Sequence, residues 1–155
     1  MPRVKLTQAK AGKMVKTISR PKPVLGLGDY ERLAEFRYLL RRFLIFSESA
    51  AVAAGLTAQQ HQALLAIKGA RRGKDLTTGA LAERLGIRHN SAVGLVDRLE
   101  KKGLVRRKPG SDDRRQVLLR LTRKAERELA RLSLAHRNEL QRLAPTLRML
   151  LRHFH

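Results

Sequence analysis

A short stretch near the middle of the chain concentrates side chains that can hydrogen-bond to the edges of nucleic-acid bases. His89, Asn90 and Ser91 carry such groups in succession, and Arg98 and Lys102 follow at helical spacing. Short polar side chains can pair with base edges, whereas Arg and Lys also pair with phosphates. These residue types therefore predict a helix that recognises nucleic acid. The first three residues would face bases, and the two cations would meet phosphates.

Other kinds of chemistry have less support. His136 and Glu139 lie three residues apart on one predicted helix, and His153 and His155 lie near the end of the chain, so a metal site is an alternative. The sequence contains no His-Glu-x-x-His motif, no glycine-rich phosphate loop and no recognisable serine nucleophile motif. It therefore predicts no enzyme, no metal and no cofactor.

The polar residues need a helix to present them. Asn90 is a good N-cap, because its short side chain can accept from the free amides of the first turn. Val93, Val96 and Leu99 then recur at helical spacing, and Gly103 supplies a left-handed stop. The expected element is a short amphipathic helix with one polar, basic face.

A second helix and a glycine turn precede this helix. Thr78 can cap the second helix, which would bury Leu81, Ala82 and Leu85. Gly86 then turns the chain toward the polar helix. Two short helices joined in this way are typical of a helix-turn-helix.

A hairpin is predicted directly after the polar helix. Residues 105–108 and 116–121 have the pattern of strands, and residues 109–115 between them are rich in turn formers. Leu76 is expected to form a one-residue bridge to these strands. A hairpin in this position is a wing. The predicted fold class is therefore mainly α with a small β-hairpin wing, a winged helix-turn-helix with a helical dimerisation region.

These residues resemble the core of the MarR family of transcription regulators. The resemblance is carried by Leu95–Arg107 and Asp112–Thr122 and extends back through Leu81–Ile87 and Leu56–Thr57. It covers roughly residues 30 to 155. It implies a homodimer that binds double-stranded DNA at a pseudo-palindromic operator, as a repressor. Many family members are released from DNA by a phenolic or other small-molecule effector.

The resemblance also assigns roles to residues near the DNA. In the family's wing motif, the Asp that matches Asp113 braces the Arg that matches Arg115, and that Arg enters the minor groove, with Arg114 between them. The alternative is that all three charges only solvate a loop tip. Family members often carry a larger polar residue where this chain has Gly94, which favours close backbone approach or shape readout here.

The composition indicates which class of binding partner to expect. The 155 residues include 34 Lys and Arg against 13 Asp and Glu, a formal charge of +21 that favours polyanions. RNA and anionic membrane surfaces are alternatives, but an aromatic content of 4% offers little for stacking unpaired bases. The chain has no Cys and no apolar run of the roughly 20 residues that span a bilayer. We therefore expect a cytoplasmic protein with no membrane partner.

Three regions are expected along the chain. Residues 1–28 are a basic N-terminal tail with seven Lys or Arg and no acidic residue, either a solvated appendage or an arm that touches DNA or a partner subunit. Residues 56–122 are the winged helix-turn-helix DNA-binding domain. Residues 29–55 and 123–155 are the helical dimerisation region.

Long apolar segments predict that dimerisation region. Asp29 is expected to cap a helix that runs over about residues 30–54, about 37 Å, which is too long for a small domain to cover alone. Thr122 is expected to cap another helix, and Pro145 to begin a separate final one. We therefore expect a second subunit to bury this apolar surface. The stripe predicted on one side of the first helix is broadened by two aromatic residues and comprises Leu33, Arg37, Leu40, Leu44, Ser47 and Ala51, with Phe36 and Phe43.

A cleft beside this first helix is where the resemblance places an effector. The next helix starts at a capping box, Thr57–Gln60, and is predicted to carry His61 and Leu65 on its inner face. His61 is either a core histidine or part of the effector pocket. Arg37 and Tyr38 are further candidates for a pocket that holds a phenolic or other aromatic molecule.

The wing motif generates the first testable prediction. If Asp113 restrains Arg115 before binding, Arg115→Ala should weaken operator binding by about 1–3 kcal/mol and leave the fold intact. Asp113→Ala should weaken binding less, and the double variant should be far from additive because both residues act on one contact. Fluorescence anisotropy on one operator duplex measures all three. Unchanged affinity of Arg115→Ala, or strict additivity, would contradict the motif.

Overall fold

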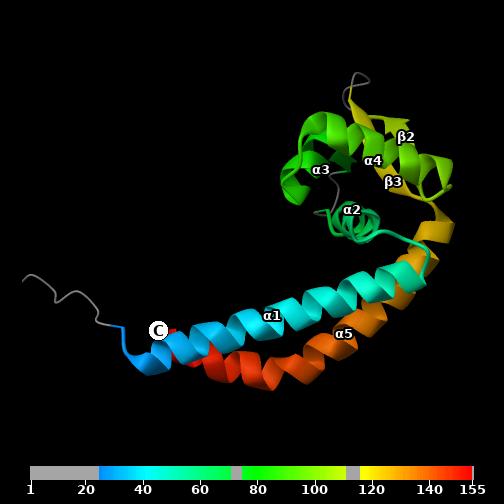
Figure 1. The fold of residues 1–155 in the computed structure, drawn as a ribbon. Coiled ribbons are helices and arrows are strands. Elements are labelled where there is room, and N and C mark those ends of the chain that lie inside the picture. Colours follow the sequence, from blue (N-terminus) through cyan, green and yellow to red (C-terminus); the bar gives the residue numbers. More distant parts are fainter. Residues whose placement is uncertain (1–24, 71–74, 111–115, 155) are drawn as a thin grey trace, which may run out of the picture.

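The computed structural model describes residues 25–70, 75–110 and 116–154. Two long helices, α1 and α5, lie side by side, and three shorter helices gather with a small sheet into a lobe at one end of this pair (Figure 1). The mainly α fold with a β-hairpin wing is confirmed. The elements are α1 (Leu27–Ala53), α2 (Ala58–Lys68), β1 (Leu76–Thr77), α3 (Thr78–Leu85), α4 (His89–Lys101), β2 (Val105–Pro109), β3 (Val117–Leu121), α5 (Arg123–Leu151) and the 3-10 helix η1 (Arg152–Phe154).

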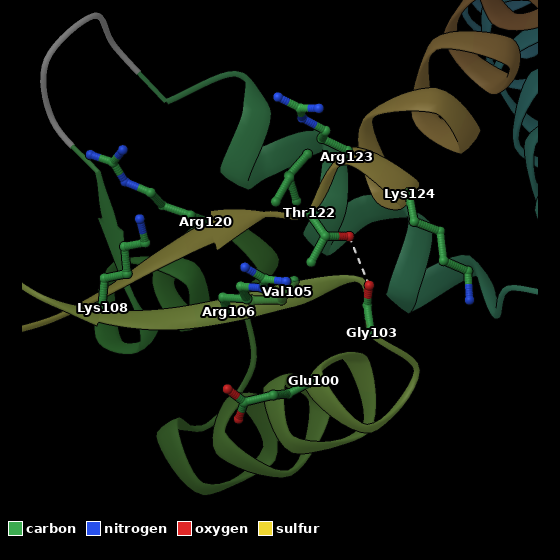
Figure 2. A pocket seen from close by; sticks show the side chains of 10 residues that line it. Glu100, Gly103, Val105, Arg106, Lys108, Arg120, Thr122, Arg123 and Lys124 are labelled. Carbon is green, nitrogen blue, oxygen red and sulfur yellow. Dashed lines mark hydrogen bonds between the residues drawn. The ribbon is translucent and has the colours of Figure 1, made fainter.

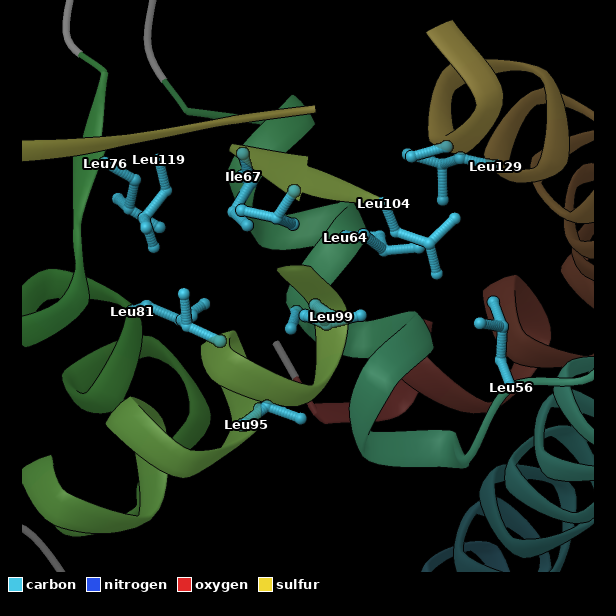
Figure 3. Packing of buried hydrophobic residues seen from close by; sticks show 14 of the residues in the cluster. Leu56, Leu64, Ile67, Leu76, Leu81, Leu95, Leu99, Leu104, Leu119 and Leu129 are labelled. Carbon is cyan, nitrogen blue, oxygen red and sulfur yellow. The ribbon is translucent and has the colours of Figure 1, made fainter. Parts of the chain in front are cut away.

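The lobe is held together by one leucine-rich core. Leu64 of α2, Leu81 of α3, Leu99 of α4 and Leu119 of β3 point into the same interior, and each is at most 1% exposed (Figure 3). Burying a side chain of this size stabilises a fold by about 1.5–3 kcal/mol. The core therefore fixes how the helix-turn-helix and the hairpin sit relative to each other.

The sheet has three antiparallel strands in the order β1-β3-β2. Leu76 of β1 pairs with Leu119 of β3, so the predicted bridge to the hairpin is confirmed. On the other side, Arg107 of β2 also pairs with Leu119. Gly110 donates its N–H to the Gln116 carbonyl at 2.8 Å, which continues the pairing of the hairpin beyond β2. Residues 111–115 lie outside the described residues.

Several helix ends follow directly from local side chains. The Thr57–Gln60 capping box is present, and Thr122 caps α5 by accepting the Ala125 N–H at 3.2 Å. Thr77, rather than Thr78, caps α3, because Thr77 is still in the extended conformation of β1 and its hydroxyl accepts from the α3 backbone. At α1 the predicted cap is also displaced, since Gly26 is the N-cap and Asp29, three residues later, accepts its N–H at 2.8 Å.

The two long helices share a smaller apolar cluster. Leu39 of α1 packs with Leu143 and Leu150 of α5, flanked by Phe36 and Phe43. The stripe predicted on α1 is only partly correct. Ala51 is buried, but three of its leucines are 42–53% exposed. Phe36 and Phe43, which were predicted to broaden the stripe, do pack at the contact with α5. Because α1 is apolar around most of its circumference, periodicity did not exclude the exposed leucines. The exposed leucines of the predicted stripe are Leu33, Leu40 and Leu44.

The prediction of a separate final helix from Pro145 is wrong, because α5 is continuous from Arg123 to Leu151 and contains this proline. Proline lacks the N–H that would bond to the preceding turn, so it usually bends a helix. In Figure 1 the C-terminal part of α5 bends as it follows α1. Packing of Leu143 and Leu150 on either side of Pro145 against α1 accounts for the continuity. No helix in the described ranges has the length and apolar character required to cross a membrane.

Candidate nucleic-acid interface

Helix α4 has one face locked into the lobe and one face exposed. Ala92, Leu95, Val96 and Leu99 are at most 1% exposed, whereas Val93, predicted on the buried face, is only half-buried. The buried face is therefore rotated slightly from the one predicted, toward Ala92 and Leu95. A helix held along one side in this way presents its opposite side in a fixed orientation.

The predicted base-reading residues lie in the first turn of α4. Arg88 occupies the N-cap position, without a side-chain capping bond, so the prediction that Asn90 is the N-cap is wrong. His89, Asn90 and Ser91 are instead the first three helical residues, and all are exposed. The tight left-handed turn at Gly86 is confirmed and brings the chain into α4 after only two further residues. The three polar side chains are therefore free of the core.

Arg98 is exposed further along the same helix, and Gly94 is half-buried beside it. A Cβ added at Gly94 would lie 3.4 Å from Nη1 of Arg98, which is an ordinary contact with the flexible end of a side chain. Packing within the chain therefore does not require glycine at this position. The missing side chain lowers the surface of α4 where a ligand could approach the backbone.

Lys102 makes contacts within the chain. Its ammonium group donates to the Gly55 carbonyl at 2.8 Å and to Oε1 of Gln60 at 3.2 Å. Lys102 therefore ties the C-terminal end of α4 to the turn between α1 and α2. The side chain is exposed, and its contact with a phosphate stays a prediction.

Arg107 links α4 to the wing, a contact that the sequence analysis did not identify. From β2, its guanidinium donates to Oδ1 of Asp97 at 2.6 Å and also pairs with Glu100. Burial alone would lower the pKa of Arg107, but the hydrogen bonds that it donates to Asp97 and Glu100 hold the pKa above its ordinary value. Two features of the sequence could have predicted this contact. Two acids lie three residues apart on α4, and the strand that follows carries basic residues that alternate between its two faces.

The remaining predicted residues lie between β2 and β3 in the sequence. Asp113, Arg114 and Arg115 belong to residues 111–115, outside the described residues. The strands on either side of this segment, β2 and β3, are in register from Val105 opposite Leu121 to Pro109 opposite Val117. The roles of the three charged residues remain predictions.

Comparison with known proteins relates this arrangement of helices and strands to a protein family. Residues 54–116, which span α2 to the start of β3, match the sequence model of the MarR family. This segment is a MarR-family domain. YcgE, an uncharacterized HTH-type transcriptional regulator of Bacillus subtilis (strain 168), is 36% identical over 84 residues, 54% of this chain and 53% of that protein. The chain spans between about a third and about a half of the curated relatives that it matches, 32% and 53%.

Solved structures of MarR-family proteins share the fold. A MarR family protein from Bacillus stearothermophilus has a TM-score of 0.68 at 23% identity, over 85% of this chain and 96% of that one. The S. aureus MepR F27L mutant, solved bound to an oligodeoxyribonucleotide, has a TM-score of 0.60 at 21% identity, over 75% and 82% of the two chains. At these low sequence identities, the similarity establishes a shared fold and no shared role.

The MarR-family domain meets the long helices at a buried histidine. His61 of α2 is 3% exposed, and its ring centroid lies 4.7 Å from that of His136 on α5. His136 donates through Nδ1 to the Leu132 carbonyl at 2.7 Å, so in its neutral form Nε2 accepts from the Ser47 hydroxyl at 2.8 Å. These contacts make His136 a bridge between α5 and α1 in this structure, rather than the metal ligand considered from sequence.

The other two pocket candidates do not join this cluster. Arg37 and Tyr38 are exposed on α1, and the guanidinium of the neighbouring Arg42 lies 5.8 Å from the centre of the Tyr38 ring. Aromatic rings that do reach His136 come from the next turns of α1, Phe43 and Phe46. Leu65, predicted on the inner face of α2, is 49% exposed. It lines a shallow, mostly apolar groove of about 440 Å³ together with residues of α5.

His61 is poorly placed to carry a proton. Its Nδ1 is buried and has no hydrogen-bond partner among the described residues. Burial lowers the pKa of His61 below its ordinary value of 6.5, and the nearby His136 lowers it further. The folded protein therefore holds His61 in its neutral form at a pH where the same side chain in the unfolded chain accepts a proton.

This difference predicts how stability depends on pH. Well above pH 6.5 both states hold His61 neutral, but as the pH falls through 6.5 the unfolded chain binds the proton more readily than the folded one, so the free energy of unfolding should decrease. His61→Phe should flatten this dependence, whereas His89→Phe, at an exposed position, should not. Urea unfolding followed by circular dichroism between neutral and mildly acidic pH measures the slope. Equal slopes for the wild type and His61→Phe would contradict the assignment.

Proposed function

We propose that the protein is a DNA-binding transcription regulator, a repressor that binds a pseudo-palindromic operator as a homodimer. The observation that carries the proposal is α4. Its exposed face presents Asn90, Ser91 and Arg98 while its other face is fixed in the core. The name of the relative YcgE, an HTH-type transcriptional regulator, and the MepR F27L structure with an oligodeoxyribonucleotide support the same function.

In the proposed complex α4 lies in the major groove, which is wide enough to admit a helix. Its first turn then faces the base edges, as is usual for a recognition helix. The amide of Asn90 can both donate to and accept from a base edge, and Arg98 lies two turns further along, within reach of a phosphate. Arg115 at the wing tip would enter the minor groove, braced by Asp113. Arg107 keeps the angle between α4 and this wing constant.

The long helices supply the proposed dimer interface, in which residues 29–55 and 123–155 pair with those of a second subunit. Leu40, Leu44 and Ile45 of α1 are 45–58% exposed, and Met149 and Leu151 of α5 are 56% and 47% exposed. Removing such apolar surface from water is the main driving force for association. A two-fold pair would present its two α4 helices to successive major grooves, about one helical turn apart.

An effector would act by changing that spacing. The proposed effector is a small phenolic or other aromatic molecule bound between the MarR-family domain and the long helices. The cluster of Phe43, Phe46, His61 and His136 lies at this junction and provides aromatic contacts. A ligand that binds more tightly to one spacing of the α4 helices shifts the protein toward that spacing. Release from DNA follows if the favoured spacing no longer matches the two grooves.

Sequence-specific binding is tested at Asn90. An operator is first selected from random duplexes with the full chain. Asn90→Ala should then weaken binding to this operator by about 1–3 kcal/mol and relax selectivity at one base pair, because the amide reads a base edge. Asn138→Ala, which removes an exposed asparagine from α5, is the matched control. If the wild type binds the selected and a scrambled duplex equally, the proposed function fails.

The dimer is tested separately from DNA. Leu44→Glu places a charge on the exposed apolar face of α1 and should convert the dimer to a monomer, because burying an unpaired carboxylate is costly. Val117→Glu changes a similarly exposed side chain on the wing, 45% against 53%, and should remain dimeric. Light scattering at matched concentrations gives the molecular mass. A Leu44→Glu variant that remains a stable dimer would rule out this interface.

A further inference from the structure

A basic groove lies beside the wing strands, and the proposed function does not use it. We call it the wing groove. It has a volume of about 840 Å³ and lies between β2, β3, the last turn of α4 and the first turn of α5 (Figure 2). Glu100 is the one acidic side chain among the described residues that line it. The cations that line it are Arg106, Lys108, Arg120, Arg123 and Lys124.

Strand alternation separates the wing groove from the contact with α4. Successive side chains of a strand point to opposite faces, so Arg107 reaches α4 whereas Arg106 and Lys108 point away from it. Arg106 is the register partner of Arg120 on β3. Like charges directly opposite each other destabilise a sheet. Two adjacent strands therefore place two exposed arginines opposite each other on this face, and of these Arg120 is paired with Asp75.

The acids near the wing groove are already engaged. Glu100 pairs with Arg107. Asp75 accepts from Nε of Arg120 at 3.0 Å and from its Nη2 at 2.5 Å, which orients this guanidinium across the sheet. Arg106 and Lys108 are exposed. The groove therefore presents positive charge on a rigid base.

The start of α5 adds cations where they are least favourable. Arg123 and Lys124 are the first two residues of α5, and the N-terminal end of a helix carries a partial positive charge. The ammonium of Lys124 donates to the Lys102 carbonyl at 3.1 Å, which holds it beside the end of α4. A bound phosphate would pair with Arg106 and would offset the positive charge at the helix end.

The lining indicates the class of ligand. No aromatic side chain is among the described residues that line the wing groove, so it offers no platform on which unpaired bases could stack. A row of cations without such a platform suits the regularly spaced phosphates of a duplex. The wing groove lies at the other end of α4 from the proposed base contact. Glu100, which lines the groove, is ten residues beyond Asn90 on α4, about 15 Å along the helix.

We propose that the wing groove binds the phosphate backbone of a second DNA duplex segment, separate from the one that α4 reads. This inference rests on the proposed function and extends it. A protein with two such surfaces per subunit holds flanking or distant DNA against the operator complex. The first surface selects the sequence, and the second contributes affinity that does not depend on sequence.

The experiment measures capture of a second duplex. The selected operator is immobilised and saturated with the full chain, and a fluorescent duplex of unrelated sequence is then added over a range of salt concentrations. The groove variant is Arg106→Gln/Lys108→Gln/Arg123→Gln. The matched control is Arg41→Gln/Arg137→Gln/Arg148→Gln, which removes the same charge from exposed positions on α1 and α5. Because these helices supply the proposed dimer interface, light scattering first verifies that the control and groove variants have the oligomeric state of the wild type. The control is essential because the chain carries a net charge of +21.

The wild type and the control should capture the second duplex, and the groove variant should capture it about tenfold more weakly. Each lost phosphate contact should also reduce the salt slope by about 0.9. Equal capture by groove and control variants, or no capture by the wild type, would overturn the inference. So would a loss of operator affinity as large as the loss of capture, because the groove would then touch the operator itself.

Two further readouts keep the test independent of the proposed function. If no operator can be selected, the proposed function fails, and the wing groove is then tested by direct binding of the unrelated duplex to immobilised protein. The groove variant should still bind more weakly than the control variant. Single-stranded RNA of equal length is added as a competitor. RNA that displaces the duplex more effectively than unlabelled duplex does would assign the groove to RNA and overturn the inference.

Discussion

The geometry of the candidate interface depends on the ion pairs of Arg107 with Asp97 and Glu100. An isolated surface pair contributes at most about 1 kcal/mol, but a guanidinium shared between two carboxylates on successive helical turns also fixes direction. Here it sets the orientation of β2 relative to α4. The hydrophobic core beneath contributes most of the stability. The charged contact orders the surface that meets a ligand, because hydrophobic packing alone has little directional preference.

The structure uses its few acids to position its many cations. Asp75 orients Arg120, Glu126 accepts from Lys68 at 2.6 Å, and Asp97 orients Arg107. Each of these pairs joins two different parts of the fold. These three cations are therefore held in place by the structure. A preorganised cation loses less rotamer entropy when a phosphate arrives.

Local physics explains which parts of the fold could be predicted from the sequence. The Thr57–Gln60 box, the Thr122 cap and the left-handed glycines at 86 and 103 depend on neighbours within a few residues, so the sequence contains their whole cause. Errors arose where a strand and a helix share a residue, as at Thr77. They also arose where an apolar helix has several candidate faces, as at Leu40 and Leu44 of α1.

The candidate site also contains features that could be predicted from the local sequence and features that could not. Exposure of His89, Asn90 and Ser91 followed from the position of a short amphipathic helix, and burial of His61 followed from its face of α2. Contacts between residues distant in sequence could not be predicted. The attachment of Lys102 to Gly55 spans 47 positions, and no local pattern indicates it. Its cause is the folded arrangement of α1, α2 and α4, which periodicity does not describe.

That attachment gives α4 a mechanical role. One end of the helix is fastened by Lys102 to the Gly55 carbonyl at the end of α1, and the other end carries the polar residues of the first turn. Arg107 contacts α4 at Asp97 and Glu100, close to the same C-terminal end. The C-terminal end of α4 is therefore the point at which the long helices, the lobe and the wing are all connected.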